Sequence, residues 1–490
     1  MLAVAACGDS GQSAVDAGAQ LDATVEAPRD IRDDVVYLAM IDRFVNGDPS
    51  NDGDGDVSCF QPGSDLGFHG GDLIGAENRL DYLQELGVTT LWTTPLYAGT
   101  FCGSHGYWPA FESQPHIEVE RNLGGEAAMD SLVLALHERG MHIMLDMVVN
   151  HAGYRAPIVG EKPDWFHDPD ICNGSEILCE LAGLPDFAQE KPEVAAFLTE
   201  TSRLWAERFQ IDGIRMDTAK HVPLGYFRDH WLPAMDESRS DLYTIAEVFD
   251  ESGPEALEPY LDVGFDSAFH FPLRRVILES VGAGGNLDEV AGMVRRSVEV
   301  LGLDGATRMT NFLSNHDVPR WIDAALERGM DEAEAVPRYR MAQALTIALP
   351  GIPQLYAGDE LCMRGVFPAN RQLMPAWSFS AVDRAGEHPE SDGDGQECFE
   401  ATRDLLTIRA QHPSLRRGSY EELWSQGGGE PVFAFLRGAG DERVVVIVNA
   451  SAAASSIIPI PLRGNPRLSP DDRLALGDGT ELVDLFGRGA

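Results

Sequence analysis

The sequence predicts a (β/α)8 barrel with a small excursion domain after its third strand and a C-terminal antiparallel β-sandwich domain. Two observations predict the barrel. Short, nearly continuous apolar runs, typical of parallel strands buried on both faces, alternate with helical patterns along most of the chain. In addition, acidic, His and Arg residues directly follow several of these runs, where a barrel places its functional groups.

The strands are expected in eight runs, at residues 35–41, 88–94, 142–149, 211–216, 242–246, 264–269, 308–313 and 352–356. Helical patterns lie between them at residues 77–86, 126–139, 192–209, 226–235, 287–301 and 333–348. Eight strands in βα alternation fit a closed barrel better than a doubly wound sheet.

The domain boundaries are expected where this alternation is interrupted. Residues 31–152 and 190–415 form the predicted barrel. Residues 153–189 are rich in Pro, Gly and Asp and too long for a simple βα loop, which predicts the excursion domain. Residues 416–490 contain short β runs with Gly-rich turns, which predict the C-terminal β domain.

Residues 1–30 are expected to be a lipoprotein-type signal remnant followed by a flexible linker. Val4-Ala5-Ala6-Cys7 resembles the end of a bacterial lipoprotein signal, although the usual basic region is lacking. Residues 8–28 are rich in Gly, Ala, Ser, Asp and Gln without periodicity, as linkers are. The alternative is an ordinary tail with a chance Cys. We therefore expect an exported protein, attached to a membrane through lipidated Cys7.

The charge of the chain excludes one class of partner. With 37 Lys and Arg against 79 Asp and Glu, the formal net charge is -42. A surface with this much negative charge repels phosphate backbones, and we therefore expect no nucleic-acid partner. No apolar run approaches the roughly 18 residues of a membrane span. We expect a monomer.

Six cysteines besides Cys7 are expected to form disulfides. An even count together with an export signal favours disulfides over buried free thiols. Six cysteines allow about fifteen pairings in principle. The sequence spacing favours three local bridges, namely Cys59–Cys102, Cys172–Cys179 and Cys362–Cys398.

Three carboxylates are candidates for catalysis because each follows a predicted strand. Asp217 follows the fourth strand, Glu247 the fifth and Asp317 the seventh. Any one of them alone could simply cap a helix. Their joint placement at strand ends favours a catalytic role instead. Arg215 lies two residues before Asp217 and thus on the same strand face, where it would hold that carboxylate ionised.

In combination these segments resemble the signature regions of the α-amylase family, glycoside hydrolase family 13, as found in bacterial α-amylases and cyclodextrin glycosyltransferases. The four strand-end segments are residues 146–151, 213–221, 246–249 and 312–317. Further stretches that resemble family motifs are Asp42-Arg43-Phe44, Gly70-Gly71-Asp72, His105-Gly106-Tyr107-Trp108, Leu184-Pro185-Asp186-Phe187 and Tyr356-Ala357-Gly358-Asp359-Glu360. The resemblance extends from residue 35 to 412.

The resemblance implies a role for each of these residues. Asp217 matches the nucleophile, Glu247 the acid/base and Asp317 the third carboxylate that binds sugar hydroxyls. Retaining glycosidases need such a pair of carboxylates, and the acid should have a raised pKa. The residues that match substrate-binding positions are His105, Tyr107, His151, Arg215, Lys220, His221, Asn315 and His316.

Calcium is the metal that the resemblance implies. The stretch from residue 46 to 56 is dense in Asp and Asn, whose hard oxygens suit Ca2+. The residues that match ligands of a first site are Asn46, Asp48, Asn51, Asp52, Gly70 and Asp72. A second site would use Asn150, Asp186 and the carbonyl of His221. The alternative for the acidic stretch is a solvated turn.

The expected function is retaining hydrolysis of internal α-1,4-glucosidic bonds in starch, maltodextrins or related α-glucans. One alternative is that the same site transfers sugars or cleaves cyclomaltodextrins. A remote alternative is a non-catalytic, glucan-binding surface lipoprotein. The presence of Asp217, Glu247 and Asp317 argues against that binder, which would be expected to lack a carboxylate.

Overall fold

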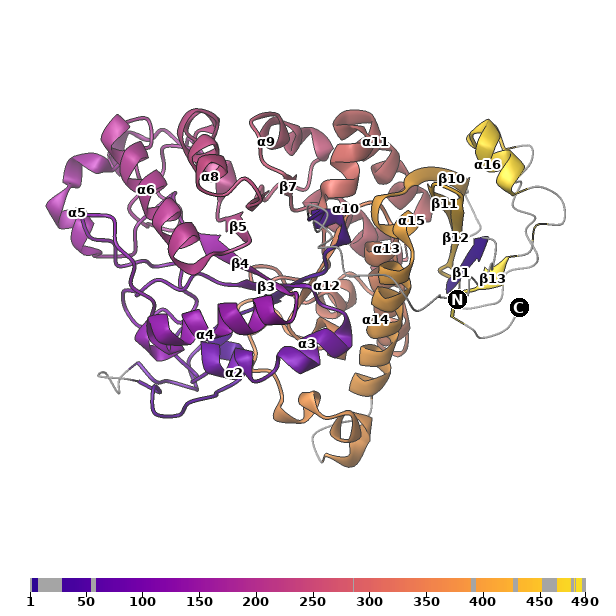
Figure 1. The fold of residues 1–490 in the computed structure, drawn as a ribbon, viewed down its shortest axis with the longest axis horizontal. Coiled ribbons are helices and arrows are strands. Elements are labelled where there is room, and N and C mark those ends of the chain that lie inside the picture. The colour runs from indigo at the N-terminus through magenta and orange to yellow at the C-terminus, as the bar shows by residue number, and fades with distance from the viewer. Residues whose placement is uncertain are drawn as a thin grey trace, which may run out of the picture.

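The computed structural model describes residues 2–7, 29–53, 59–284, 286–388, 394–425, 431–451, 465–476, 480 and 482–486. A large barrel surrounded by helices lies beside a small antiparallel sheet (Figure 1). The two parts pack through one shared set of buried residues, in which Phe433 and Phe435 of the small sheet join the outer helices of the barrel.

Eight parallel strands form the barrel in chain order. They are β2 (Val36–Ala39), β3 (Thr90–Thr93), β4 (His142–Met147), β5 (Gly213–Met216), β6 (Tyr243–Ala246), β7 (Ser267–Ala268), β8 (Thr310–Asn311) and β9 (Ile352–Tyr356). β2 also pairs with β9, and a parallel bridge between Phe269 and Thr310 joins β7 to β8. Nearly every strand residue is buried, as the continuous apolar runs predict. The predicted (β/α)8 barrel is confirmed.

Seven of the eight strands are shorter than predicted, and the difference is largest for β7 and β8. The expected runs at 264–269 and 308–313 contribute only β7 and β8, which are two residues each. The neighbouring aromatic residues Phe269 and Phe312 pack edge to face, with ring centroids 5.7 Å apart, instead of extending the strands. The apolar runs therefore mark the barrel core here more than they mark strand length.

The outer layer consists of helices that follow the strands. The α-helices that lie between the barrel strands or follow the last of them are α1 (Ile41–Phe44), α2 (Leu73–Glu77), α3 (Leu80–Leu86), α4 (Gly125–Glu138), α6 (Pro192–Phe209), α7 (Leu224–Tyr226), α8 (Leu232–Ser238), α9 (Glu258–Asp262), α10 (Phe271–Ile277), α11 (Leu287–Arg308), α12 (Trp321–Glu327), α13 (Ala335–Ala348) and α14 (Asp394–Gln411). α11 runs past the predicted end at residue 301 through a kink at Gly302, whose φ is 70°. Glycine adopts this left-handed conformation at little steric cost.

The excursion region after β4 is small and irregular. It contains α5 (Pro157–Glu161) and two short 3-10 helices, η3 (Pro163–Trp165) and η4 (Pro169–Ile171). Antiparallel bridges join His151 to Asp186 and Phe166 to Phe187, and the two Phe rings stack with centroids 4.7 Å apart. α5 lies at the end of the molecule opposite the small sheet (Figure 1).

The C-terminal region forms a five-stranded antiparallel sheet in the order β10-β11-β12-β1-β13. Its strands are β10 (Ser419–Ser425), β11 (Val432–Ala439), β12 (Glu442–Asn449), β1 (Leu2–Cys7) and β13 (Val483–Asp484), and the flanking helices are α15 (Pro413–Arg417) and α16 (Pro470–Ala475). The expected antiparallel β structure is confirmed. The described residues of this region form a single sheet, so the second layer of the expected sandwich is not seen among them.

Strand β1 lies where the leader was expected from the sequence. Leu2–Cys7 pairs along β12, from Leu2 opposite Val448 to Cys7 opposite Arg443. An edge strand carries unpaired backbone N–H and C=O groups, and an added strand satisfies them. Residues 8–28, where the flexible linker was predicted, lie outside the described residues.

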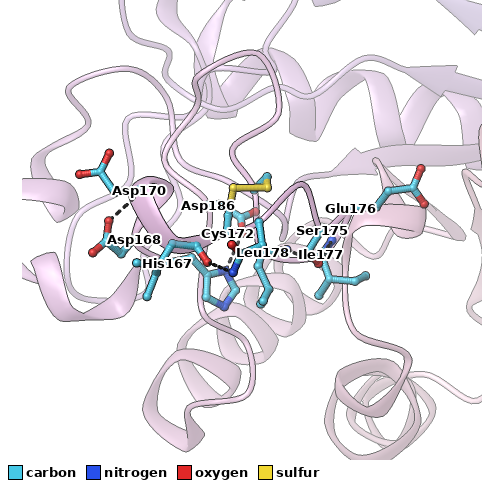
Figure 2. The surroundings of a disulfide bond; sticks show 12 residues. His167, Asp168, Asp170, Cys172, Ser175, Glu176, Ile177, Leu178 and Asp186 are labelled. Carbon is cyan, nitrogen blue, oxygen red and sulfur yellow. Dashed lines mark hydrogen bonds and ion pairs between the residues drawn. A yellow bond between two sulfur atoms is a disulfide. The ribbon is translucent and has the colours of Figure 1, made fainter.

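All three predicted disulfides are present. Cys59 bonds to Cys102, Cys172 to Cys179 and Cys362 to Cys398. The Cys172–Cys179 bridge closes a short loop in the excursion region (Figure 2). Of the helices in the described part of the chain, none combines the length and apolarity needed to cross a bilayer.

Candidate active site

The three candidate carboxylates line one cleft at the C-terminal ends of the barrel strands. Asp217 directly follows β5, Glu247 directly follows β6, and Asp317 lies in the loop after β8. The cleft has a volume of about 500 Å³. It also contains five of the predicted substrate-binding residues, namely His105, Tyr107, His151, Lys220 and His221. The barrel thus brings together residues that lie far apart in the sequence.

Arg215 lies beneath the cleft and joins its carboxylates. The side chain is fully buried on β5. Its Nη1 atom donates to Asp217 Oδ1 at 2.7 Å and to Asp146 Oδ1 at 2.7 Å, and its Nη2 atom forms an ion pair with Glu247. The predicted contact between Arg215 and Asp217 is confirmed. One buried cation therefore holds three carboxylates in fixed positions.

Asp146 is a further site residue, which was not among those predicted from the sequence. It is buried on β4, and its second oxygen accepts hydrogen bonds from Trp92 Nε1 at 3.2 Å and Tyr107 Oη at 2.8 Å. With Arg215, the carboxylate thus has three donors. Burial raises the pKa of Asp146 well above its ordinary value, and Arg215 and Tyr107 oppose this effect. The signal that could have identified Asp146 is its position as the one acidic residue within the buried run 142–149.

The environments of Asp217 and Glu247 set their proton affinities. Burial raises the pKa of Asp217, and Arg215 opposes this effect. Burial also raises the pKa of Glu247; Arg215 opposes it, whereas the charges of Asp217 and Asp317 reinforce it. The backbone N–H of Thr218, a residue with a φ of 45°, donates to Glu247 Oε2 at 2.9 Å. The left-handed turn at Thr218 thus aims this donor at Glu247.

Asp317 lies between a histidine and an arginine. Its Oδ2 atom is 3.0 Å from His316 Nε2, and its Oδ1 atom accepts from Arg371 Nη2 at 3.0 Å. Burial raises the pKa of Asp317, but His316, Arg371 and Arg215 outweigh burial and hold the pKa well below its usual range. Arg371 comes from the loop after β9 and was not selected from the sequence, because a single Arg in a polar loop gives no signal.

Asn315 and His316, which were predicted to bind substrate, lie beneath the cleft surface. Both are buried, and Asn315 Oδ1 accepts from the Asp317 backbone N–H at 2.8 Å. The ring of His316 stacks on Tyr107, with centroids 5.2 Å apart and planes 2° apart. These two residues therefore hold Asp317 and Tyr107 in position from below.

Tyr107 is fixed by histidines as well as by Asp146. Its backbone N–H donates to His105 Nδ1 at 3.0 Å, and its carbonyl lies 3.0 Å from His151 Nε2. Burial lowers the pKa of His105 to about 3 and that of His151 to about 4. Both rings are therefore neutral at pH 7 and can act as hydrogen-bond donors or acceptors toward a neutral ligand.

Lys220 and His221 border the cleft next to the excursion region. Lys220 Nζ lies 3.1 Å from Glu176 Oε1 and 3.4 Å from Asp250 Oδ2. His221 Nδ1 lies 2.8 Å from the carbonyl oxygen of Glu176. Glu176 and Asp250 were not selected from the sequence, since these contacts join segments that are distant along the chain.

Most of the residues predicted for the first calcium site lie close to at least one other member of the set. Asp52 accepts from Asn46 Nδ2 at 3.0 Å, and Asp72 Oδ2 accepts from Asn51 Nδ2 at 3.2 Å. A Cβ atom on Gly70 would lie 2.6 Å from Asn46 Nδ2 and from Asp52 Oδ1, so these groups approach the Gly70 backbone closely. The Asp48 carboxylate instead accepts from the Ser50 N–H at 2.9 Å.

The residues predicted for the second calcium site converge on one point. The side-chain oxygen of Asn150 lies 3.3 Å from Asp186 Oδ1 and 2.9 Å from the carbonyl oxygen of His221. Reversing the Asn150 amide would replace this contact between oxygens by two hydrogen bonds. Within the described ranges, no three His, Cys, Asp or Glu side chains gather as a metal site.

Comparison with known proteins places this geometry in a family. The family model described as "Alpha amylase, catalytic domain" matches residues 39–168 and 177–405. The chain is 29% identical to a "Beta/alpha-amylase" of Paenibacillus polymyxa over 85% of this chain, and it spans only 33% of that protein. It is 26% identical to a "Cyclomaltodextrinase" of Geobacillus thermopakistaniensis over 90% of this chain and 72% of that protein.

A solved structure agrees with these matches. The crystal structure of an Anoxybacillus α-amylase aligns with a TM-score of 0.75 at 31% identity, covering 86% of this chain and 88% of that one. The family match covers well over half of the chain and includes all three cleft carboxylates. The chain belongs to the α-amylase family, glycoside hydrolase family 13, and is a glycoside hydrolase.

Proposed function

We propose that the protein hydrolyses internal α-1,4-glucosidic bonds of soluble α-glucans, such as maltodextrins, with retention of configuration. The observation that carries this proposal is the contact of Asp217 and Glu247 with the two terminal nitrogens of one guanidinium, that of Arg215. Retaining glycosidases hold their two carboxyl groups only about 5 Å apart, whereas inverting enzymes need a wider gap for water. Sharing one guanidinium keeps this pair close.

In the proposed mechanism Asp217 is the nucleophile and Glu247 the general acid. Asp217 attacks the anomeric carbon as the bond to the leaving oxygen breaks, and Glu247 gives its proton to that oxygen. Glu247 then takes a proton from water, the water oxygen attacks the anomeric carbon, and the bond to Asp217 breaks. This returns both carboxyl groups to their starting states.

The surroundings of each carboxyl group suit these roles. Arg215 donates to Asp217 at 2.7 Å and favours its ionised, nucleophilic form. Burial, with the charges of Asp217 and Asp317, raises the pKa of Glu247 and favours the protonated acid. Asp317 is kept ionised by Arg371 and His316, so it can accept hydrogen bonds from sugar hydroxyls and stabilise positive charge on the ring.

The second candidate is cleavage of cyclomaltodextrins or transfer of the glycosyl group to a sugar. The Geobacillus thermopakistaniensis protein named a cyclomaltodextrinase favours it, because its similarity covers 90% of this chain. Both candidates use the same carboxylates and differ in the substrate and in the acceptor that reaches the glycosyl-enzyme. A non-catalytic binder is the third candidate and would need none of these carboxylates.

Product analysis tests the proposal. The purified protein is incubated with maltoheptaose, soluble starch and β-cyclodextrin, and the first products are followed by chromatography and by proton NMR of the anomeric signals. We expect linear maltooligosaccharides that appear first as the α-anomer. Asp217→Asn should abolish turnover, whereas Asp262→Asn, an exposed change on α9, should retain it.

Each other result has a definite meaning. A β-anomer as first product would contradict the retaining mechanism. Faster turnover of the cyclic substrate, or products longer than the substrate, would favour the second candidate. No turnover of any α-glucan would favour the binder.

Calcium belongs to the proposal as a structural ion. Asn150, Asp186 and the His221 carbonyl would hold one ion between barrel and excursion region, because three oxygens that face one another without a proton between them suit a hard cation. Asn46, Asn51, Asp52, Asp72 and the Gly70 backbone would hold a second. The buried Asn51 Oδ1 atom, which has no hydrogen-bond partner among the described residues, fits that role.

Export from the cell also belongs to the proposal. Three disulfides form and persist in oxidising compartments, which supports an extracellular or periplasmic location. Lipid attachment at Cys7 would require cleavage before that residue, and this would remove most of strand β1. The mass of the mature N-terminus therefore distinguishes an anchored protein from one that keeps this strand.

A further inference from the structure

The disulfide-closed loop of the excursion region lies against the catalytic barrel. Cys172 and Cys179 bond to each other and close the loop (Figure 2). Inside it, Ser175 Oγ accepts from the backbone N–H groups of Ile177 at 3.2 Å and Leu178 at 3.3 Å. The covalent bond and these hydrogen bonds restrain the loop around its exposed residue Glu176.

Glu176 makes two contacts with the segment that follows the nucleophile strand. Its carboxylate lies 3.1 Å from Lys220 Nζ, and its carbonyl oxygen lies 2.8 Å from His221 Nδ1. Lys220 also lies 3.4 Å from Asp250, in the loop after β6. One lysine therefore joins the excursion loop to two barrel loops, and the chain contains only three lysines in all.

The same segment is connected to Glu247. The backbone N–H of Lys220 donates to the Glu247 carbonyl at 3.4 Å, and the Thr218 N–H donates to its carboxylate at 2.9 Å. If Glu247 is the general acid, it must reach the oxygen that joins the cleaved sugar to the leaving group. Asp317 and its partner Arg371 line the same cleft as Lys220 and Glu247.

We propose that Glu176 is a positioning residue that holds Lys220 on the leaving-group side of the cleft, where the ammonium binds a hydroxyl of the leaving or accepting sugar. This inference rests on the proposed function. An ammonium has three N–H donors, and within the described residues two carboxylates contact this one, which leaves a donor for the cleft that Lys220 lines. Glu176 restricts where that donor points.

Two observations separate this role from a general structural one. The Glu176 carboxylate in the ion pair with Lys220 is 62% exposed, and such an ion pair contributes little to the stability of the fold. A stabilising role therefore does not explain this contact. The family match also stops at residue 168 and resumes at residue 177. Glu176 thus lies in a segment that varies from the family pattern, where a chain can adjust specificity without altering the catalytic carboxylates.

The test compares two substrates with different leaving groups. Maltopentaose has a sugar as its leaving group, whereas α-maltosyl fluoride releases fluoride, which needs no contact with Lys220. For Glu176→Gln we expect the kcat/KM on maltopentaose to fall about 3- to 10-fold, mainly through KM, the size of one weakened charge-assisted hydrogen bond. The kcat/KM on maltosyl fluoride and the melting temperature should stay unchanged.

Three further variants complete the test. Asp170→Asn is the matched control, since this exposed carboxylate lies just outside the loop (Figure 2), and the carboxylates that contact Lys220 among the described residues are those of Glu176 and Asp250. The Cys172→Ser/Cys179→Ser variant should reproduce the loss on maltopentaose if the disulfide acts by holding Glu176. Adding Glu176→Gln to it should then cause no further loss, because both changes release the same contact.

The outcomes separate this inference from the proposed function. If wild type cleaves both substrates and Glu176→Gln matches wild type, the positioning role is wrong and the proposed function stands. An equal loss on both substrates would also overturn the role, because it would mean a general effect on the catalytic centre. If wild type cleaves neither substrate, the proposed function fails and this inference fails with it.

Discussion

Asp146 and Asp217 share one nitrogen atom of Arg215: Nη1 lies 2.7 Å from a carboxylate oxygen of each. Asp146 lies on β4, and Asp217 directly follows β5, so the guanidinium connects two neighbouring strands of the barrel. Asp146 also holds the Tyr107 hydroxyl at 2.8 Å. The position of the proposed nucleophile therefore depends on a carboxylate that does not line the cleft.

The first prediction concerns this positioning carboxylate. We expect Asp146→Asn to lower kcat on maltoheptaose by about 100-fold, because Arg215 and Tyr107 lose the acceptor that holds them and a small misplacement of reacting groups is costly. Steady-state kinetics on maltoheptaose measure this loss.

The control for this prediction is Asp130→Asn, which removes an exposed carboxylate paired with Arg208 on the outer surface. It should leave kcat unchanged. An Asp146→Asn variant with wild-type kinetics would show that Arg215 keeps its position without this partner.

The second prediction separates the roles of Glu247 and Asp217. Glu247→Gln cannot protonate a leaving group, so turnover of maltoheptaose should fall by at least about 100-fold. The first step with α-maltosyl fluoride needs no such proton and should be largely retained, seen as a burst of fluoride. Asp217→Asn should lose activity on both substrates. The opposite pattern would exchange the two roles.

The third prediction concerns the pH dependence of the wild-type enzyme, which follows from the raised pKa of Glu247. Glu247 must carry its proton to act, and burial together with Asp217 and Asp317 raises its pKa above the ordinary value of 4.5. Activity should therefore fall as pH rises through this raised pKa, and the alkaline limb of kcat/KM should lie above that ordinary value. A limb at or below it would contradict the proposed acid.

The fourth prediction concerns calcium. If ions occupy the two proposed sites, EDTA should lower the melting temperature, because an ion at 100 times its Kd stabilises the folded state by about 2.7 kcal/mol. Differential scanning calorimetry measures the shift, and elemental analysis of the dialysed protein counts the ions. Ca2+ should restore the temperature and Mg2+ should not.

A variant assigns the calcium effect to one site. Asp186→Ala should reduce the response to EDTA by removing one of the converging oxygens. An unchanged melting temperature with EDTA and no bound metal would instead favour the reversed Asn150 amide, which satisfies the same oxygens by hydrogen bonds.

The fifth prediction compares two disulfides. Cys362 and Cys398 are 36 residues apart, whereas Cys172 and Cys179 are 7 apart. In the chain-entropy description, removing the first bridge costs about 4 kcal/mol and removing the second about 2 kcal/mol, because the longer loop gains more freedom in the unfolded chain. Urea unfolding of the two double Ser variants tests this order, which a smaller loss for Cys362–Cys398 would contradict.

The barrel could be predicted from the sequence because its physical signal is local. A parallel strand covered on both faces is mostly apolar, so each of β2 to β6 and β9 appears as a nearly continuous apolar run. The cysteine pairings were predictable for a similar reason, since each bridge joins two cysteines that follow one another along the chain with no other cysteine between them. β7 and β8 were predicted too long, because aromatic residues beside them are apolar without being in the strand.

The candidate site was predictable only where a residue follows a strand. Asp217 and Glu247 are such residues, and the strand direction alone brings them to one end of the barrel. Arg371 and Glu176 lie in polar loops whose sequences give no sign of their contacts. Strand β1 lies where a leader was expected, because a short apolar run suits both a signal and a strand of the small sheet.

The sequence by itself thus determined the fold class, the disulfides and the carboxylates of this glycoside hydrolase, because burial, spacing and strand order are written along the chain. Only the tertiary structure decided that Arg215 joins Asp146 to Asp217, that Arg371 faces Asp317, and that Glu176 holds Lys220. These are contacts between charged groups on segments that are distant along the chain. Coulomb attraction acts through space, so it requires no regular spacing of residues that could be recognised in the sequence.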